Sequence, residues 1–364
     1  MCTIQQPPVL KNGAGYLWVY FTGEGAGAEA VSFALSDGND ALRWLSLNKG
    51  QPVIFSKYGE KGLRDPFILR SHDGSRFYLL ATDLNVHERP GGFHTGQLSG
   101  SRYLEIFEST DLIHWSHQRH VQVADVNAGN TWAPKAIWDA EQQLYVVYWA
   151  ANLYDESDPQ KRTSITYNRM MYSLTPDFIT FTPPRIWVDV DRGPGKGTID
   201  ATVAKVDGRY YRFMKEEETM TIRLDTATNL LATVVGTDYA AAKEGPADQW
   251  RTLGRKIGNG LPNGEGREFT GGEGPCLFPA NSGDTNGFKW FLFIDQPGYH
   301  DGPNHYIGFA GNDLADSRSW QPVSQKLRQQ LPENSKGEKP RHGSVISLTP
   351  EEYQRIWQHY FQSE

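Results

Sequence analysis

The feature that most limits the fold of this chain is a hairpin pattern that recurs five times. Each repeat opens with a short strand rich in aromatic and β-branched residues, and most continue into a second strand. The repeats start roughly 60 to 80 residues apart, which suits one four-stranded blade of a β-propeller with its loops. The opening strands read GYLWVYFTG, RFYLLATD, QLYVVYWA, RYYRFMKE and KWFLFIDQ, and four of the second strands lead to Trp44, Trp115, Phe181 and Trp320.

A further strand precedes every hairpin except the first. These strands are DPFILR from Asp65, APKAIW from Ala133, TIDATVAKV from Thr198 and GPCLF from Gly274. The missing strand lies at the other end of the chain, where residues 342–348 read HGSVISL and no hairpin follows. We therefore predict an all-β, five-bladed β-propeller whose C-terminal strand closes the N-terminal blade and removes two exposed sheet edges. A β-sandwich of unrelated hairpins is the alternative.

Residues 1–364 are predicted to form a single propeller domain with a short C-terminal helix. The helix is indicated by TPEEYQRIWQHYFQ, which begins with a capping box at Thr349. Two long irregular stretches, 87–101 and 239–272, interrupt the repeats. Loops of this length are usually functional or disordered, so we expect them to rim one face and shape a pocket, with solvated insertions as an equally open alternative.

Charge and cysteine content exclude several classes of function. The net charge of -7 without a basic block argues against a nucleic-acid or membrane partner. The two cysteines, Cys2 and Cys276, are too few for a disulfide framework and are expected to be free thiols. The first residues lack the basic and apolar regions of a signal peptide, so we expect a cytoplasmic protein, or a secreted one if a leader precedes the sequence as written.

Charged residues stand where the inner strands begin. Inner strands line the axis of a propeller, so Asp65, Asp200, Glu273 and His342, with Lys135 in the remaining blade, should converge on one end of the channel. A carboxylate cluster suits glycoside hydrolysis, in which one acid protonates the leaving oxygen and another carboxylate activates water or attacks the anomeric carbon. A third carboxylate raises the pKa of the acid by repulsion.

The tripeptide Glu-Gly-Pro occurs twice, at Glu244 and at Glu273. Glu273 is followed by a strand and then by KWFLFID, whereas Glu244 is followed by Ala-Asp-Gln-Trp without a strand pattern. We therefore expect Glu273 to be functional and Glu244 to be a loop residue.

Five motifs together resemble glycoside hydrolase family 43. They occur in order over nearly the whole chain: RDPF at 64–67, TWAP at 131–134, TIDAT at 198–202, EGP at 273–275 and RHGS at 341–344. The resemblance implies a five-bladed β-propeller that acts with inversion on arabinose- and xylose-containing glycans. The Asn-Asp-Pro-Asn stretch of fructan-acting relatives is absent, which argues against invertases and levansucrases.

The resemblance also implies roles for individual residues. Asp65 would be the general base, Glu273 the general acid, and Asp200 would orient the acid and tune its pKa. His342 would match an axial histidine that holds a water cluster or a calcium ion, and Trp132 would stack on a sugar ring.

Three further expectations complete the site. Arg64, the first residue of the RDPF motif, is a candidate for substrate binding together with Trp132 and His342. No cofactor is required, and calcium near the axis, with His342 as the candidate metal residue, is left open because calcium prefers several oxygen ligands. Lys135 stands where family members often carry an acid, and it could pair with Asp200 or Asp65 or point away into the sheet.

Other motifs give weaker evidence about function. The stretch 193–198 lacks the spacing of a phosphate loop and precedes a strand. The acidic run 216–218 is interpreted as a solvated face, although Lys215 and Glu216 end a strand near the channel and could touch substrate. His87 and His94 lack metal-ligand spacing and would only shape the pocket.

The sequence therefore predicts an inverting exo-glycosidase that releases terminal α-L-arabinofuranosyl residues from arabinoxylan or arabinan oligosaccharides. A β-D-xylosidase or an endo-arabinanase of the same family is the alternative, and a non-catalytic carbohydrate-binding propeller is the hypothesis from another class. Inversion predicts that the carboxyl groups of Asp65 and Glu273 lie roughly 6.5 to 9.5 Å apart.

Overall fold

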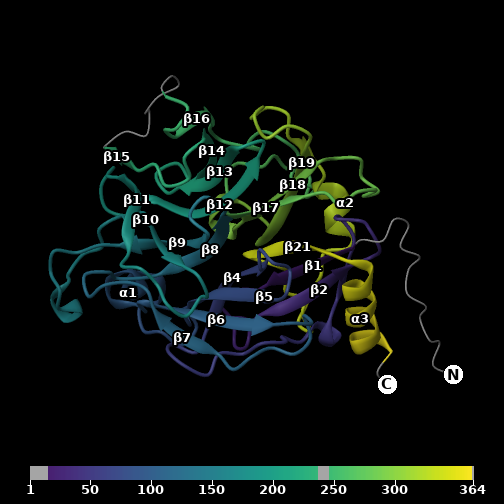
Figure 1. Ribbon diagram of the computed structural model, residues 1–364, viewed down its shortest axis with the longest axis horizontal. Helices are drawn as coiled ribbons and strands as arrows, with labels where there is room; N and C mark the ends of the chain where they lie inside the picture. Colours follow the sequence, from purple (N-terminus) through teal and green to yellow (C-terminus); the bar gives the residue numbers. More distant parts are fainter. Residues whose placement is uncertain (1–14, 237–245, 363–364) are drawn as a thin grey trace.

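Five β-sheets stand around a central axis as the blades of a propeller (Figure 1), as the repeats predict. The structure is a computed structural model and describes residues 15–236 and 246–362. Within each blade, neighbouring strands pair mainly in the antiparallel direction.

The strands of each blade are given from the axis outward. Blade 1 contains β21 (Gly343–Leu348), β1 (Gly15–Tyr20), β2 (Ser32–Ser36) and β3 (Trp44–Ser46). Blade 2 contains β4 (Leu63–Arg70), β5 (Phe77–Asp83), β6 (Tyr103–Ser109) and β7 (Arg119–Gln122). Blade 3 contains β8 (Trp132–Asp139), β9 (Leu144–Asn152), β10 (Asn168–Thr175), β11 (Arg185–Val190) and β15 (Val234–Gly236).

Blade 4 contains β12 (Thr198–Val206), β13 (Arg209–Glu216), β14 (Thr221–Ala227) and β16 (Arg251–Gly254). Blade 5 contains β17 (Glu273–Pro279), β18 (Trp290–Gln296), β19 (His305–Gly311) and β20 (Gln321–Pro322). The inner strands β21, β4, β8, β12 and β17 contact one another in this order, and β17 contacts β21 again, so the ring is complete.

Helices are few in the described residues. They are α1 (Gly92–Ser99), α2 (Ser324–Gln329) and α3 (Pro350–Phe361), with the 3-10 turns η1 (Asn48–Gly50), η2 (Pro159–Lys161) and η3 (Gly298–His300). The capping box predicted at Thr349 is confirmed, because its side chain accepts from the Glu352 amide and the Glu352 carboxylate accepts from the Thr349 amide. In the described ranges, no helix has the length and apolar character needed to cross a bilayer.

The two irregular stretches hold structure that the sequence pattern did not indicate. The stretch 87–101 contains α1, whose glycine-rich sequence has no helical periodicity of apolar residues. The described part of 239–272 contains β16, a four-residue strand that is too short to show alternation. Blade 3 gains a fifth strand, β15, which pairs with β11 in the parallel direction. Cys276 is buried and free, as expected, whereas Cys2 and Glu244 lie outside the described residues.

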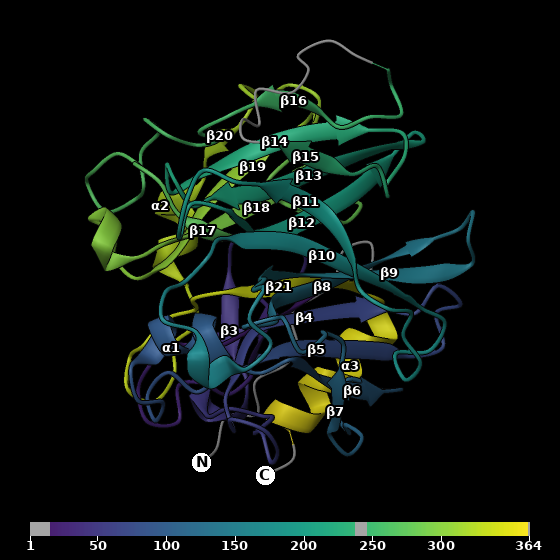
Figure 2. The same cartoon turned by 90° about the vertical axis from the view of Figure 1, so that its left-hand side faces the viewer.

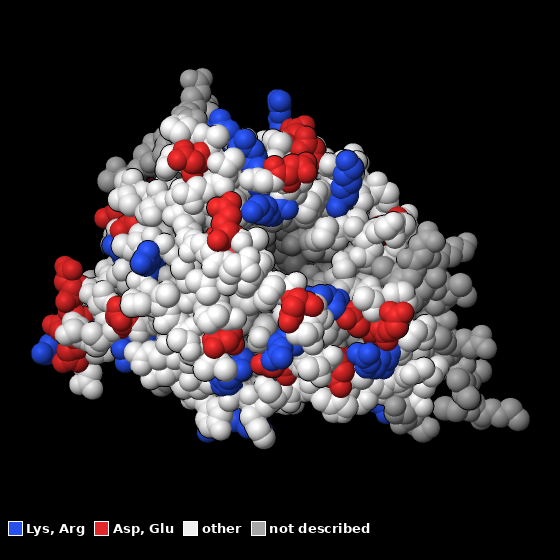
Figure 3. Space-filling model, viewed as in Figure 1, with Lys and Arg blue, Asp and Glu red and all other residues white. Residues whose placement is uncertain are grey.

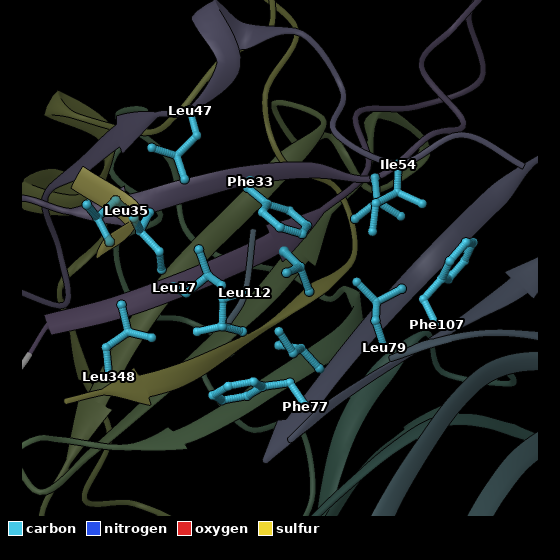
Figure 4. Close-up of a cluster of buried hydrophobic side chains, with 14 of the residues drawn as sticks. Leu17, Phe33, Leu35, Leu47, Ile54, Phe77, Leu79, Phe107, Leu112 and Leu348 are labelled. Carbon is cyan, nitrogen blue, oxygen red and sulfur yellow. The ribbon is translucent and has the colours of Figure 1, made fainter. Parts of the chain in front are cut away.

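The ring closes between the two ends of the chain, as predicted. Strand β21 pairs with β1 in a regular antiparallel register from Gly15 opposite Leu348 to Tyr20 opposite Gly343. Buried apolar side chains from β1, β2, β5 and β21 then fill the space between blades 1 and 2 (Figure 4). Helix α3 adds Tyr353, Ile356 and Trp357 to this cluster. The C-terminal segment therefore completes the sheet of blade 1 and covers the core between blades 1 and 2.

Replacement of Leu348 by Ala tests this closure. Leu348 is 3% exposed, and its loss should leave a cavity that lowers the free energy of unfolding by about 2 to 5 kcal/mol. Chemical denaturation with intrinsic fluorescence measures the change. Arg355→Ala, on the exposed side of α3, is the control and should change stability by less than about 0.5 kcal/mol. Equal stability of the two variants would contradict a core sealed by β21.

Candidate active site

Four of the five inner strands begin with the same irregularity. In β4, β8, β12 and β17, the pairing with the next strand shifts register near the start, which marks a β-bulge. One residue at each shift has a positive φ: Asp65 (50°), Ala133 (51°), Asp200 (59°) and Gly274 (57°). Residues other than glycine rarely adopt this conformation, and it persists where the surrounding structure holds it, often at functional sites.

The bulges show which positions are equivalent between blades. Asp65 and Asp200 occupy the same place in blades 2 and 4, and Gly274 occupies it in blade 5. Glu273 therefore stands one residue earlier than the two aspartates. All three acids stand near the starts of inner strands, as predicted, but the one-residue offset of Glu273 was not predicted, because strand alternation does not reveal where a left-handed residue falls.

Gly274 brings blade 5 close to a histidine. A Cβ atom at this position would lie 2.5 Å from Cδ2 of His342, and the φ of 57° disfavours any larger residue. Only glycine therefore lets the imidazole ring stand against the start of β17.

Hydrogen bonds connect each aspartate to the bulge of the next blade. Asp200 Oδ2 accepts from the Gly274 amide at 2.9 Å. Asp65 Oδ2 accepts from the Thr82 hydroxyl at 2.7 Å, and that hydroxyl accepts from the Ala133 amide at 2.8 Å. The two carboxyl groups are thus fixed by neighbouring blades as well as by their own backbone.

His342 lies among three carboxylates. Its Nδ1 is 2.7 Å from Asp65 Oδ1, and its Nε2 is 3.4 Å from Asp295 Oδ2 and 3.5 Å from Glu273 Oε1. Burial alone would lower the pKa of His342, but these carboxylates raise it well above its usual value. These contacts therefore favour the imidazolium form of the ring.

The same contacts act on Asp65. Burial favours its protonated form, but the hydrogen bond from His342 and the charges of His342 and Arg64 outweigh burial and lower the pKa. Asp65 is therefore a carboxylate.

The protonation of Glu273 and Asp200 is the reverse of what the sequence suggests. Glu273 Oε2 contacts Lys215 Nζ at 2.5 Å and accepts from the Tyr299 hydroxyl. Burial favours the protonated form of Glu273, but the Lys215 charge prevails and holds the pKa well below its usual value. The pKa of Asp200 is instead raised, first by burial and also by repulsion from Glu273. As the side chains stand, Glu273 is ionised and Asp200 holds a proton more readily.

These groups open into one cavity of about 560 Å³ at the end of the axis where the inner strands begin. Helix α1 forms one wall with Phe93 and Gln97, and Trp132 packs edge-on against Phe93. Tyr299 and Asn304, from the segment after β18, lie in another part of the wall. Figure 2 shows α1 on the side of the ring where β4 begins. The volume suits a small ligand.

The substrate-binding residues predicted from the sequence also lie in the cavity. Arg64, Trp132 and His342 line the cavity, as does each predicted acid. Arg64 is held by ion pairs of 2.9 Å to Glu24 and to Glu29.

Lys135 adopts neither of the two arrangements expected from the sequence, an ion pair with an aspartate or a side chain that points away into the sheet. Its side chain is buried, and Nζ donates to the Pro275 carbonyl at 2.6 Å. It therefore joins blade 3 to blade 5 across the axis and does not form an ion pair with Asp65 or Asp200.

The sequence did not indicate every residue that lines the cavity. A solvated face is wrong for Glu216, which is 3% exposed and pairs with Arg192 and Arg223. Glu217 lines the cavity, and Lys215 does so too, as its place at the end of a strand had suggested. Tyr299 comes from a loop that carries no motif, so no signal indicated it. Of the described part of 239–272, no residue lines the cavity.

Whether the site suits a metal ion depends on the ligand atoms that it offers. Ligand atoms of Asp200, Glu273 and His342 lie within 4.8 Å of one another. Two carboxylates and a ring nitrogen are fewer oxygen ligands than calcium takes. Calcium at the axis stays a prediction from the resemblance, and no chemical step is assigned to it.

Comparison with known proteins identifies the family. A family model described as "Probable glycosyl hydrolase domain", and related to glycoside hydrolase family 43, matches residues 12–354. The chain belongs to this glycosyl hydrolase family. An α-L-arabinofuranosidase of Bifidobacterium longum subsp. longum is 35% identical over 227 residues, which cover 59% of this chain. The match spans about a fifth of that relative, 21% of its length.

Solved structures match this chain at low sequence identity. An α-L-arabinofuranosidase of Fusarium graminearum, in complex with an iminosugar inhibitor, has a TM-score of 0.50 and 13% identity, and the match covers 87% of this chain and 79% of that one. An endo-1,4-β-xylanase of Bacteroides thetaiotaomicron has a TM-score of 0.48 and 13% identity, with 84% of each chain covered. The first of these supports the fold of the glycosyl hydrolase domain.

Thr82→Val tests the connection between the bulges. The variant keeps the volume of the side chain but leaves the Ala133 amide and the Asp65 carboxylate without their shared hydroxyl. The free energy of unfolding should fall by about 1 to 3 kcal/mol, as measured by denaturant titration. Thr82→Ser retains the hydroxyl and should recover most of the loss. Wild-type stability in the Val variant would contradict the connection.

Glu217 should make stability depend on pH. Burial raises the pKa of this carboxyl from 4.5 to about 7, so the folded state binds its proton more tightly than the unfolded state. The free energy of unfolding should therefore fall as pH rises from about 4.5 to about 7, by at most about 3 kcal/mol from this group. Glu217→Gln should remove this part of the pH dependence. Glu218→Gln, at an exposed neighbour, should leave the profile unchanged, and identical profiles for all three proteins would contradict the assignment.

Proposed function

We propose that this glycosyl hydrolase domain is an inverting exo-glycosidase that releases terminal α-L-arabinofuranosyl residues from arabinoxylan or arabinan oligosaccharides. The observation that carries the proposal is the convergence of Asp65, Asp200 and Glu273 on one cavity whose volume suits a small ligand. The arabinofuranosidase named for the 35% identical relative supports the sugar.

Asp65 is the general base in this proposal. Its lowered pKa keeps it able to accept a proton from water, and Thr82 and His342 hold both of its oxygens in place. His342 contacts both Asp65 and Glu273, and the carboxyl separation that inversion requires stays a prediction.

Glu273 is the general acid and must take up a proton before the bond breaks. Water then gives a proton to Asp65 while its oxygen attacks the anomeric carbon, and the leaving oxygen takes the proton from Glu273. Asp200 lies beside Glu273, and repulsion between two ionised carboxyl groups favours one proton on the pair, which Asp200 holds more readily as the side chains stand. Lys215 opposes this protonation, so its contact with Glu273 must weaken when the sugar binds.

The charges of the cavity favour a neutral ligand. Its cationic side chains Arg64, Lys215, Arg341 and His342 are each paired with carboxylates. Positive and negative side chains are also interspersed on the face drawn in Figure 3. A neutral sugar, with Trp132 as an aromatic surface for its ring and Arg64 at the wall, fits these groups better than an anionic one.

A β-D-xylosidase is the closest alternative, because pentoses of both kinds fit a cavity of this size. An endo-arabinanase would need a cavity open at two ends, and a carbohydrate-binding propeller would need no acid.

The limits of the single domain, residues 1–364, stay a prediction.

Hydrolysis of p-nitrophenyl α-L-arabinofuranoside and of p-nitrophenyl β-D-xyloside tests the proposal. Wild type should prefer the arabinoside, and Glu273→Gln should lower kcat/KM by about 100- to 10,000-fold because general-acid catalysis is lost. Glu268→Gln, at an exposed glutamate, should behave as wild type. No turnover of either substrate, or an active Glu273→Gln variant, would contradict the proposal.

Lys215→Met tests the role of the lysine. Removal of the cation should raise the pKa of Glu273, so the alkaline limb of the pH profile of kcat/KM should move up by about one to three units. The acidic limb, which reports the base Asp65, should move less. An unchanged alkaline limb would show that Glu273 is not the acid that Lys215 controls.

A further inference from the structure

Two polar side chains in the cavity wall, Gln97 and Glu217, take no part in the proposed chemistry. They belong to different blades and are joined by a chain of three asparagines. Asn130, Asn152 and Asn168 are all 0% exposed, although buried amides are costly unless their hydrogen bonds are made.

The direction of the hydrogen bonds in this chain is fixed at the Glu217 end. Asn168 Oδ1 accepts from Asn130 Nδ2 at 3.1 Å and from Asn152 Nδ2 at 3.0 Å. The Nδ2 group of Asn168 is therefore the donor, and it donates to Glu217 Oε1 at 3.1 Å. The backbone amide of Gly197 donates to Glu217 Oε2 at 3.1 Å. Each carboxylate oxygen thus receives one bond from a fixed donor.

The other end of the chain orients Gln97. Asn152 Nδ2 donates to Gln97 Oε1 at 3.2 Å, so the group that Gln97 can offer to a ligand is its Nε2 donor. Because Gln97 lies on α1, the chain of amides also fixes the helix that forms one wall of the cavity.

We propose that Glu217 and Gln97 form a binding site for two neighbouring hydroxyl groups of the sugar in the cavity; this rests on the proposed function only for the class of ligand. A carboxylate has about four lone-pair positions, and the two fixed donors use two of them. The other two can accept from the hydroxyls of a vicinal diol, and Gln97 Nε2 can donate to one of the same oxygens. The buried amides pre-organise this pair and so reduce the entropy lost on binding.

Calorimetric titration with L-arabinose, D-xylose and D-galactose tests the site without any hydrolysis. At a pH above the raised pKa of Glu217, where its carboxyl group is ionised, the sugar that binds wild type most tightly should bind Glu217→Gln about tenfold or more weakly, because bonds to a charged acceptor are lost. Glu218→Gln, at the adjacent exposed glutamate, should bind as wild type. Gln97→Leu should weaken binding less than Glu217→Gln, since it removes one donor.

Singly deoxygenated analogues of that sugar separate a contact from a structural effect. Removal of either of two adjacent hydroxyls should weaken binding to wild type but make little difference to Glu217→Gln. Equal affinity of wild type and Glu217→Gln, equal sensitivity of both to deoxygenation, or no binding of any of the three sugars by wild type would overturn the proposal. Sugar binding with these properties but without turnover of either p-nitrophenyl glycoside would instead refute the proposed hydrolysis alone.

Discussion

The contact of His342 with carboxylates of two blades is the interaction on which the axial end of the molecule depends. His342 immediately precedes β21, the strand that closes the ring, and it reaches Asp65 of blade 2 and Glu273 and Asp295 of blade 5. Without a cation, these buried carboxylates would repel one another. Closure of the propeller therefore delivers the charge that lets several acids share one cavity.

The β-bulges determine the direction in which the carboxyl groups point. A regular strand points successive side chains to opposite faces, so it cannot turn a carboxylate from the sheet toward the axis without an irregularity. The left-handed residues Asp65 and Asp200 provide it, and the hydroxyl of Thr82 and the amide of Gly274 hold the result. The backbone strain of these residues is located where the proposed chemistry needs fixed oxygens.

The sequence predicted what depends on periodicity. Five hairpins, the closing strand and the capping box of α3 follow from alternation and from local hydrogen bonding, and the motifs that carry Asp65, Asp200 and Glu273 mark the strand starts. The sequence did not reveal the offset of Glu273, which depends on backbone dihedral angles. Nor did it reveal Tyr299, Gln97 and the carboxylate of Glu217, because loops and long-range amide contacts place them in the cavity. The contact of Lys215 with Glu273 depends on the packing of β13 in blade 4 against β17 in blade 5.

The most direct test of the proposed mechanism is the configuration of the first product. Proton NMR during hydrolysis of p-nitrophenyl α-L-arabinofuranoside by wild type distinguishes the two anomers of arabinofuranose before they equilibrate. If Asp65 activates water across the sugar from Glu273, the β-anomer should form first. First formation of the α-anomer would mean retention through a nucleophilic carboxylate, and Asp65 could then not be the general base that activates water opposite Glu273.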